Sequence, residues 1–210
     1  MNAQQKKSTI AWGLAQGLSV VFSPLLMPTY AMCVAFWLTY MRAFPLSPRL
    51  WATGAVFFLT ALCPLLFILL LINRGKVSDL DITDRRQRTA PFLATILCYI
   101  GAGLVLIFLN APRWLWMFVA GAVVIGILCL FISKRWKISA HCAAAGGLTA
   151  LVLQLALNDV LIYPLAWLTV AFAMCGGVAW ARLYLHKHTI LQTAAGTFLA
   201  FAVEMIFLSI

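Results

Sequence analysis

Residues 50–73 read LWATGAVFFLTALCPLLFILLLIN, an apolar stretch without a charged side chain. A helix needs about 20 such residues to cross the hydrocarbon core of a bilayer, so this stretch predicts a membrane-spanning helix. The composition extends the prediction to the whole chain. Of its 210 residues, 64% are hydrophobic and 10% are charged, whereas roughly a quarter of the residues in soluble domains are charged. Soluble fold classes are therefore excluded, and we expect an all-α, polytopic membrane helical bundle.

Further apolar stretches predict the other spans. We expect spans over residues 25–42, 50–73, 92–110, 114–133, 140–157, 161–181 and 189–209. Pro24 and Pro28 interrupt the first stretch, because proline removes a helical hydrogen bond, so residues 9–23 should form an interfacial or re-entrant segment. The result is six to seven spans in one domain, residues 1–210. Its parts are an N-terminal region (1–73), a charged loop (74–91) and a five-helix core (92–210).

Alternating spans bring four polar segments to one membrane face: the N-terminus, 74–91, 134–141 and 182–188. They hold all but Arg42, Arg49 and Arg113 of the 15 Lys and Arg residues. The positive-inside rule favours the cytoplasm for this face. The alternative is an outward-facing site, because arginines recruited to a site do not report topology. We expect an integral, multi-pass protein of a bacterial inner membrane. The net charge of +10 indicates loops at anionic headgroups or a site for an anionic substrate, rather than nucleic acid.

The longest polar stretch is SDLDITDRRQRTAP, residues 78–91. Its arginines are Arg85, Arg86 and Arg88. Guanidinium groups bind phosphate oxygens two at a time, which suits an anion site. Asp81 and Asp84 would partly neutralise the arginines in an empty site, or support a histidine. The alternative is a self-paired polar loop at the membrane surface.

The segment KISAHCAAAGG, residues 137–147, places Ser139 and His141 at the start of a predicted span. A helix N-terminus offers free backbone N–H groups and a positive dipole end, which favour a phosphate. The alternative is that Ser139 is an N-cap and His141 an interfacial side chain.

The segment ARLYLHKHTILQ, residues 181–192, separates Arg182 from His188 by five residues. Gln192 follows His188 by one helical turn and can therefore hold the second ring nitrogen of the histidine. A histidine fixed in this way can act as a nucleophile or a base. The alternative is an ordinary basic loop.

In this order, the motifs RQRTAP, ISAH and ARLYLHKHTILQ resemble the type-2 phosphatidic acid phosphatase and vanadium haloperoxidase superfamily. The family pattern has Lys and Arg-Pro, then Pro-Ser-Gly-His, then Ser-Arg, five residues, His, three residues and Asp. The resemblance covers about residues 85–192. It rests on the order of the motifs, the two helix pairs between them and the spacing from Arg182 to His188.

The resemblance implies a phosphatase-like core in which His188 attacks phosphorus and forms a phosphohistidine. His141 would protonate the leaving alcohol. Arg182 and Arg88 would clamp the phosphoryl oxygens, with Arg85 as a competitor of Arg88. Neither a metal nor a cofactor is implied.

The chain also departs from the family pattern. Ser139, which could add a donor, is kept, but Asp81 stands where the family has Lys, and Ala181 replaces the Ser before the arginine. Gln192 stands where the family has Asp. An amide can fix the tautomer of the nucleophilic histidine but cannot neutralise its imidazolium. Asp81 or Asp84 could supply that charge.

The expected function is therefore hydrolysis of a phosphomonoester or diphosphate on a membrane lipid, through a phosphohistidine. Its partners would be the lipid phosphate and the bilayer. The alternative is a catalytically degenerate lipid-phosphate-binding protein, a transporter or a scaffold.

Overall fold

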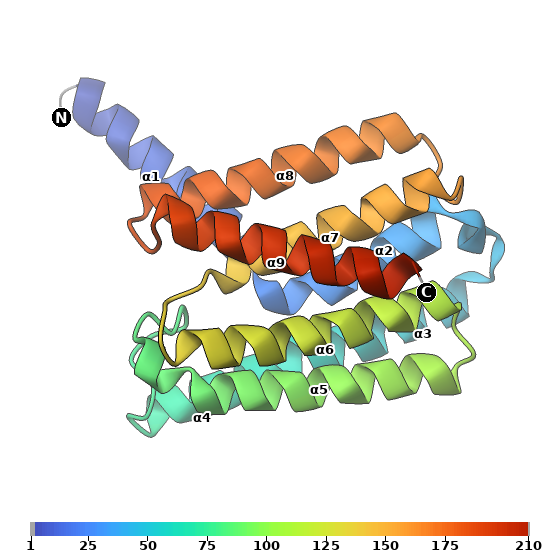
Figure 1. Cartoon of the computed structure of the whole chain (residues 1–210), viewed down its shortest axis with the longest axis horizontal. Coiled ribbons are helices and arrows are strands. Elements are labelled where there is room, and N and C mark those ends of the chain that lie inside the picture. Colours follow the sequence, from blue (N-terminus) through green and yellow to red (C-terminus); the bar gives the residue numbers. More distant parts are fainter. Residues whose placement is uncertain (1–2, 210) are drawn as a thin grey trace.

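A computed structural model describes residues 3–209, with side chains from residue 9 onward. The described part is an all-α bundle of roughly antiparallel helices (Figure 1). Six helical segments are long and apolar enough to span a membrane: Leu46–Asn73, α5 (Thr89–Phe108), α6 (Arg113–Ser133), α7 (Ala140–Leu157), α8 (Pro164–Tyr184) and α9 (Ile190–Ser209). The chain is therefore an integral, multi-pass membrane protein, as its composition predicts.

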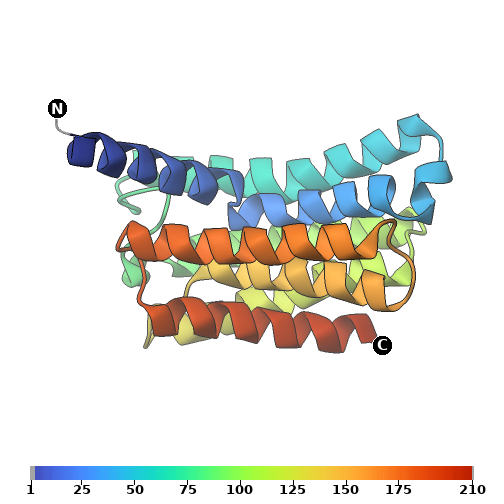
Figure 2. The same ribbon diagram turned by 90° about the horizontal axis from the view of Figure 1, so that it is seen from above.

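A seventh candidate span is broken. Helices α1 (Ala3–Val21) and α2 (Met27–Leu38) are separated by a short 3-10 turn, Pro24–Leu26, and meet at a bend of 41°. The interruption at the prolines was expected. However, α2 is only about 18 Å long, too short for a bilayer core of about 30 Å. The two helices continue in the same general direction along the bundle (Figure 2), so the end of α1 contributes to this crossing.

The segment Leu46–Asn73 is also irregular. It consists of α3 (Leu46–Phe57), a π-helical turn (Phe58–Leu62) and α4 (Cys63–Asn73). Pro64 follows this turn, and proline cannot donate the hydrogen bond that an α-helix requires at its position. The wider turn accommodates it, so the helix continues. It begins at Leu46, four residues before the predicted start.

The connections α4–α5, α6–α7 and α8–α9 lie at the same end of the bundle as the N-terminus (Figure 1). We call it the motif end, because the three motifs (residues 78–91, 137–147 and 181–192) lie there. The α2–α3, α5–α6 and α7–α8 connections and the C-terminus lie at the opposite end. The expected gathering of the polar segments is therefore confirmed.

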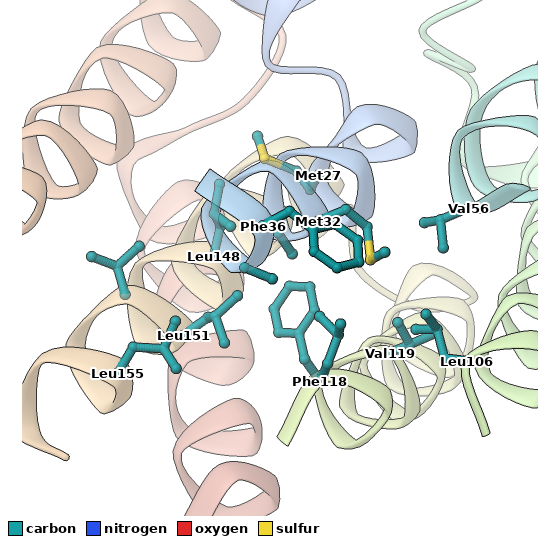
Figure 3. Packing of buried hydrophobic residues seen from close by; sticks show 14 of the residues in the cluster. Met27, Met32, Phe36, Val56, Leu106, Phe118, Val119, Leu148, Leu151 and Leu155 are labelled. Carbon is teal, nitrogen blue, oxygen red and sulfur yellow. The ribbon is translucent and has the colours of Figure 1, made fainter. Parts of the chain in front are cut away.

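The apolar core lies around α2. Met32 and Phe36 of α2 pack between Leu151 of α7 and Phe118 of α6 (Figure 3). Close packing also joins α7 to α9, because each helix presents a glycine to the backbone of the other. A Cβ atom at Gly196 would lie 2.5 Å from the carbonyl oxygen of Ser139, and one at Gly146 would clash with the backbone of Thr197. These contacts bring the starts of α7 and α9, which carry the histidine motifs, side by side.

Candidate functional site at the motif end

A cavity of about 180 Å³ lies inside the bundle and reaches the motif end. Five polar side chains from the three motifs line it: Asp81, Arg88, His141, Arg182 and His188. Most of the remaining lining is apolar, with side chains such as Phe92 and Ile96 of α5 and Ile125 of α6. The cavity therefore combines a cationic, histidine-containing end with a hydrocarbon-like interior.

The C-terminus of α8 sets the position of His188 relative to Arg182. His186 has a left-handed backbone, with φ of 52°, a conformation that terminates helices. The N–H groups of Lys187 and His188 then donate to the carbonyl of Arg182 at 3.1 and 3.3 Å. Five intervening residues are what this reversal requires, so the spacing has a structural cause. Both side chains are buried, Arg182 at 2% and His188 at 8% exposure.

The tautomer of His188 follows from its neighbours. Its Nδ1 lies 3.1 Å from Oε1 of Gln192. The same oxygen accepts a hydrogen bond from the backbone N–H of Thr189 at 3.2 Å, so this atom of the amide must be the acceptor. Nδ1 of His188 therefore carries the proton, and Nε2 keeps a free lone pair. That is the form in which a histidine attacks an electrophile.

His141 is held by the broken helix. Its Nε2 lies 3.2 Å from the carbonyl oxygen of Ser19 near the end of α1. A carbonyl only accepts, so Nε2 is the protonated nitrogen and Nδ1 is free. In a continuing helix the Ser19 carbonyl would accept from the N–H of Ser23. Near the end of α1 that N–H donates to the Val20 carbonyl instead, so the Ser19 carbonyl is available to His141.

Asp81 crosses the charged loop to the histidine motif. Its Oδ1 lies 3.3 Å from a terminal nitrogen of Arg182, and its Oδ2 lies 3.2 Å from Nζ of Lys187. The Arg182 guanidinium also contacts the hydroxyl of Ser19 at 3.4 Å, whereas its buried Nε has no hydrogen-bond partner in residues 9–209. Arg182 therefore retains an unused donor, and Asp81 stands where an anionic ligand would bind.

Arg88 is fixed by backbone carbonyls. Its Nε donates to Ile82 and its NH1 to Ile138, both at 3.0 Å. Ile82 has φ of 48°, a strained conformation for a β-branched residue. The strain turns its carbonyl to Arg88, which is only 5% exposed at the cavity wall.

The other predicted site residues lie outside this lining. Arg85 is exposed and donates to the carbonyls of Lys134 and Arg135 after α6. Arg86 is exposed, and its backbone N–H bonds the Asp84 carboxylate, which caps a short 3-10 turn. Ser139 is fully buried and caps α7, where its hydroxyl accepts from the N–H of Cys142.

The charges of this region shift the ionisation of groups outside the spans. Burial, together with Arg182, Arg88 and Lys137, lowers the pKa of His188 to about 4, although the Gln192 hydrogen bond acts in the opposite direction. Burial raises the pKa of Asp81, but Arg182, His141 and Lys187 together hold it below its ordinary value. At neutral pH the site therefore contains a neutral imidazole at His188 and an ionised carboxylate at Asp81.

Sequence reasoning missed three contributors: Ser19, Lys187 and Lys137. Ser19 precedes the first proline break, where helix carbonyls lose their partners, and this was the available signal. Lys187 is adjacent to His188, and Lys137 lies four residues before His141, so their places in the motifs could have identified them.

Among the described residues, no group of three or more His, Cys, Asp or Glu side chains is arranged to hold a metal ion. No family model matches the chain, and no curated protein or solved structure is detectably similar to it. What the fold and the site define is a class: a polytopic helical membrane protein with a buried cluster of arginines and histidines at one membrane edge.

Proposed function

We propose that the protein is a lipid phosphate phosphatase that hydrolyses a phosphomonoester or diphosphate of a membrane lipid through a phosphohistidine. One observation carries the proposal: arginines and histidines from three separate motifs line the outer end of a cavity whose interior is apolar. A lipid phosphate has this distribution of polarity, with an anionic headgroup and a hydrocarbon chain. The motif resemblance described above supports the same reaction.

In the first step, Nε2 of His188 attacks phosphorus, the N–P bond forms and the P–O bond to the lipid alcohol breaks. Nδ1 of His141, the ring nitrogen that carries no proton because Nε2 donates to Ser19, takes the proton of the monoanionic phosphate group and passes it to the leaving oxygen. Arg182 and Arg88 stabilise the charge on the equatorial oxygens, because fixed cations in a water-poor site act strongly on developing charge. In the second step, water gives its proton to His141 and attacks phosphorus, the N–P bond breaks, and phosphate leaves.

The apolar wall supports a membrane substrate over a soluble one. A soluble phosphate ester would leave the interior beyond the arginines unfilled. A lipid chain exchanges the apolar bilayer for an equally apolar wall, so its transfer into the cavity costs little. We therefore place the headgroup at the motif end and the chain in the interior.

A second candidate is a lipid-phosphate-binding protein without turnover. The observation that favours it is Gln192, whose amide orients His188 but carries no charge to stabilise the imidazolium. Asp81 supplies a carboxylate in the same cavity, but it is paired with Arg182 and Lys187.

The test is release of phosphate by the purified protein in mild detergent. The substrates are phosphatidate, phosphatidylglycerol phosphate, an isoprenyl diphosphate and a soluble aryl phosphate, without added metal. We expect release from at least one lipid and none from His188→Ala, with Thr169→Val on α8 as the control. Acid-labile phosphate trapped on the wild-type protein would identify the phosphohistidine. Tight binding of every lipid without release would instead establish the binding protein.

A further inference from the structure

Glu204 lies at the other end of the same cavity. It belongs to α9, is 0% exposed and forms part of the cavity lining. Its side chain lies beside Gly147 of α7, which follows His141 by six residues, and this separation corresponds to about 9 Å at the helical rise of 1.5 Å per residue. Within the described part of the chain, neither carboxyl oxygen has a hydrogen-bond partner. An unpaired carboxyl group this deep in a membrane bundle is costly, so it needs a functional explanation.

The space around this side chain is built for it. A Cβ atom at Gly121 of α6 would lie 2.6 Å from an oxygen of Glu204, and one at Gly147 of α7 would lie 3.3 Å from its Cγ. Any larger residue at position 121 would displace the carboxyl group. Two glycines from neighbouring helices thus leave a polar niche in an otherwise apolar wall.

The chemistry of the niche limits its occupant. An ionised carboxylate without a partner is too costly in hydrocarbon, and the charged lining residues that could pair with it, Arg88 and Arg182, are held at the motif end. A metal ion would require several further oxygen ligands, and no suitable group exists among the described residues. A lone water needs two to four polar partners. The occupant that fits best is an uncharged hydrogen-bonding group, because a neutral carboxyl both donates and accepts.

We propose that Glu204 binds a hydroxyl or amide on the chain of the lipid whose phosphate occupies the motif end. This inference rests on the proposed function for the position of the phosphate. It defines a substrate class: a long-chain phosphate with an uncharged polar group about 9 Å from the phosphorus, the rise from His141 to Gly147 along α7. Lipids whose only oxygens lie beside the phosphate, and lipids with a plain hydrocarbon chain, would leave the Glu204 carboxyl unpaired and bind more weakly.

The experiment measures binding of two alkylphosphonates to the full chain in detergent. One has a plain long chain, and the other has the same chain with a hydroxyl about 9 Å from phosphorus. The C–P bond is not hydrolysed, so the result does not depend on turnover. We expect the wild type to bind the hydroxylated probe about tenfold more tightly, the effect of one buried hydrogen bond.

Variants locate the effect. Glu204→Gln keeps a donor and an acceptor and should retain the preference, whereas Glu204→Leu fills the niche with an apolar side chain and should abolish it. Thr169→Val removes a hydroxyl from α8 that already bonds Leu165, and it should leave the preference unchanged.

Equal affinities in the wild type, or a preference that survives in Glu204→Leu, would overturn the inference. If the two probes bind equally while plain lipid phosphates are still hydrolysed, the inference about Glu204 fails but the proposed phosphatase function stands. If neither probe binds, the cavity is not an amphiphile site, and both proposals fail.

Discussion

His188, two residues before α9, faces Gln192 in the first turn of that helix, with Nδ1 and Oε1 3.1 Å apart. The backbone N–H of Thr189 fixes which end of the amide faces the imidazole. The arrangement leaves Nε2 of His188 unprotonated, which a nucleophile requires, without a negative charge behind the ring.

Gln192 should therefore limit turnover rather than binding. Gln192→Leu removes the acceptor for Nδ1 of His188, so the imidazole is no longer held in the tautomer with an unprotonated Nε2. We therefore expect kcat to fall about 10²-fold with little change in KM. Gln192→Glu keeps the length of the side chain and adds a negative charge that stabilises the imidazolium of His188, so kcat should rise. Steady-state phosphate release measures both. An unchanged kcat in Gln192→Leu would show that this contact does not act in the reaction.

Arg88 and Arg85 should separate in function, although both lie in the charged loop. Arg88→Ala removes a buried guanidinium from the cavity wall, and we expect kcat/KM to fall at least 10²-fold. Arg85→Ala removes an exposed side chain that bonds carbonyls after α6, so kcat/KM should change less than about threefold. The reverse order of effects would assign the phosphate clamp to Arg85.

Asp81 should compete with the ligand. Its carboxylate pairs with Arg182 and Lys187, so Asp81→Asn frees both cations, and inorganic phosphate or vanadate should bind about fivefold more tightly. Calorimetric titration at low salt measures the change. Asp84→Asn is the matched control, because Asp84 caps a turn in the same loop without contacting Arg182. Weaker anion binding in Asp81→Asn would mean that Asp81 holds the arginine in place rather than blocking it.

The activity should persist in mild acid. Under the proposed mechanism His188 reacts in its neutral form, and its pKa is lowered to about 4. His188 should therefore stay neutral, and kcat/KM should not fall through its protonation, as the pH falls from 7 to 5. It should decline only as the pH falls through about 4, instead of near the ordinary histidine value of about 6.5. The pH dependence of phosphate release and NMR titration of the imidazole both report this.

Replacing Lys137 tests the same pH dependence in a second way. Its charge lowers the pKa of His188, so Lys137→Met should move the acid limb to higher pH. The shift should be partial, because burial is the larger cause and remains. An acid limb near pH 6.5 in the wild type would contradict the burial of His188.

The α7–α9 contact should tolerate no side chain. Gly196→Ala puts a Cβ atom 2.5 Å from the Ser139 carbonyl, and such overpacking typically costs about 1–3 kcal/mol. We expect a lower Tm in detergent and a loss of phosphate release, because the starts of the two helices carry His141 and His188. Gly176→Ala is the control, since nothing lies within 4 Å of that position. Equal effects of the two substitutions would show that the contact does not position the site.

The sequence alone determined the class of fold and the polar end of the bundle. Both depend on local properties: the length of an apolar stretch such as 50–73 and the residues that interrupt it. Alternation of the spans then brings the charged loop and the histidine motifs to one face, whatever the packing.

Helix boundaries were less accurate where backbone chemistry intervenes. Two examples are the start of α3 at Leu46 and the π-helical turn before Pro64. Both depend on how the backbone accommodates a proline, and a hydropathy pattern carries no information about this. The spacing of Arg182 and His188 was visible in the sequence, but its cause, the left-handed His186, was not.

Only the tertiary structure decided which polar residues share the cavity. Ser19 reaches His141 and Arg182 from a distant helix, Arg88 faces inward while Arg85 faces outward, and Glu204 lies at the inner end of the cavity. These relations depend on the rotation of each helix and on the glycines that let α7 and α9 approach. They arise from contacts between residues far apart in the chain, which no local pattern of apolar and charged residues encodes.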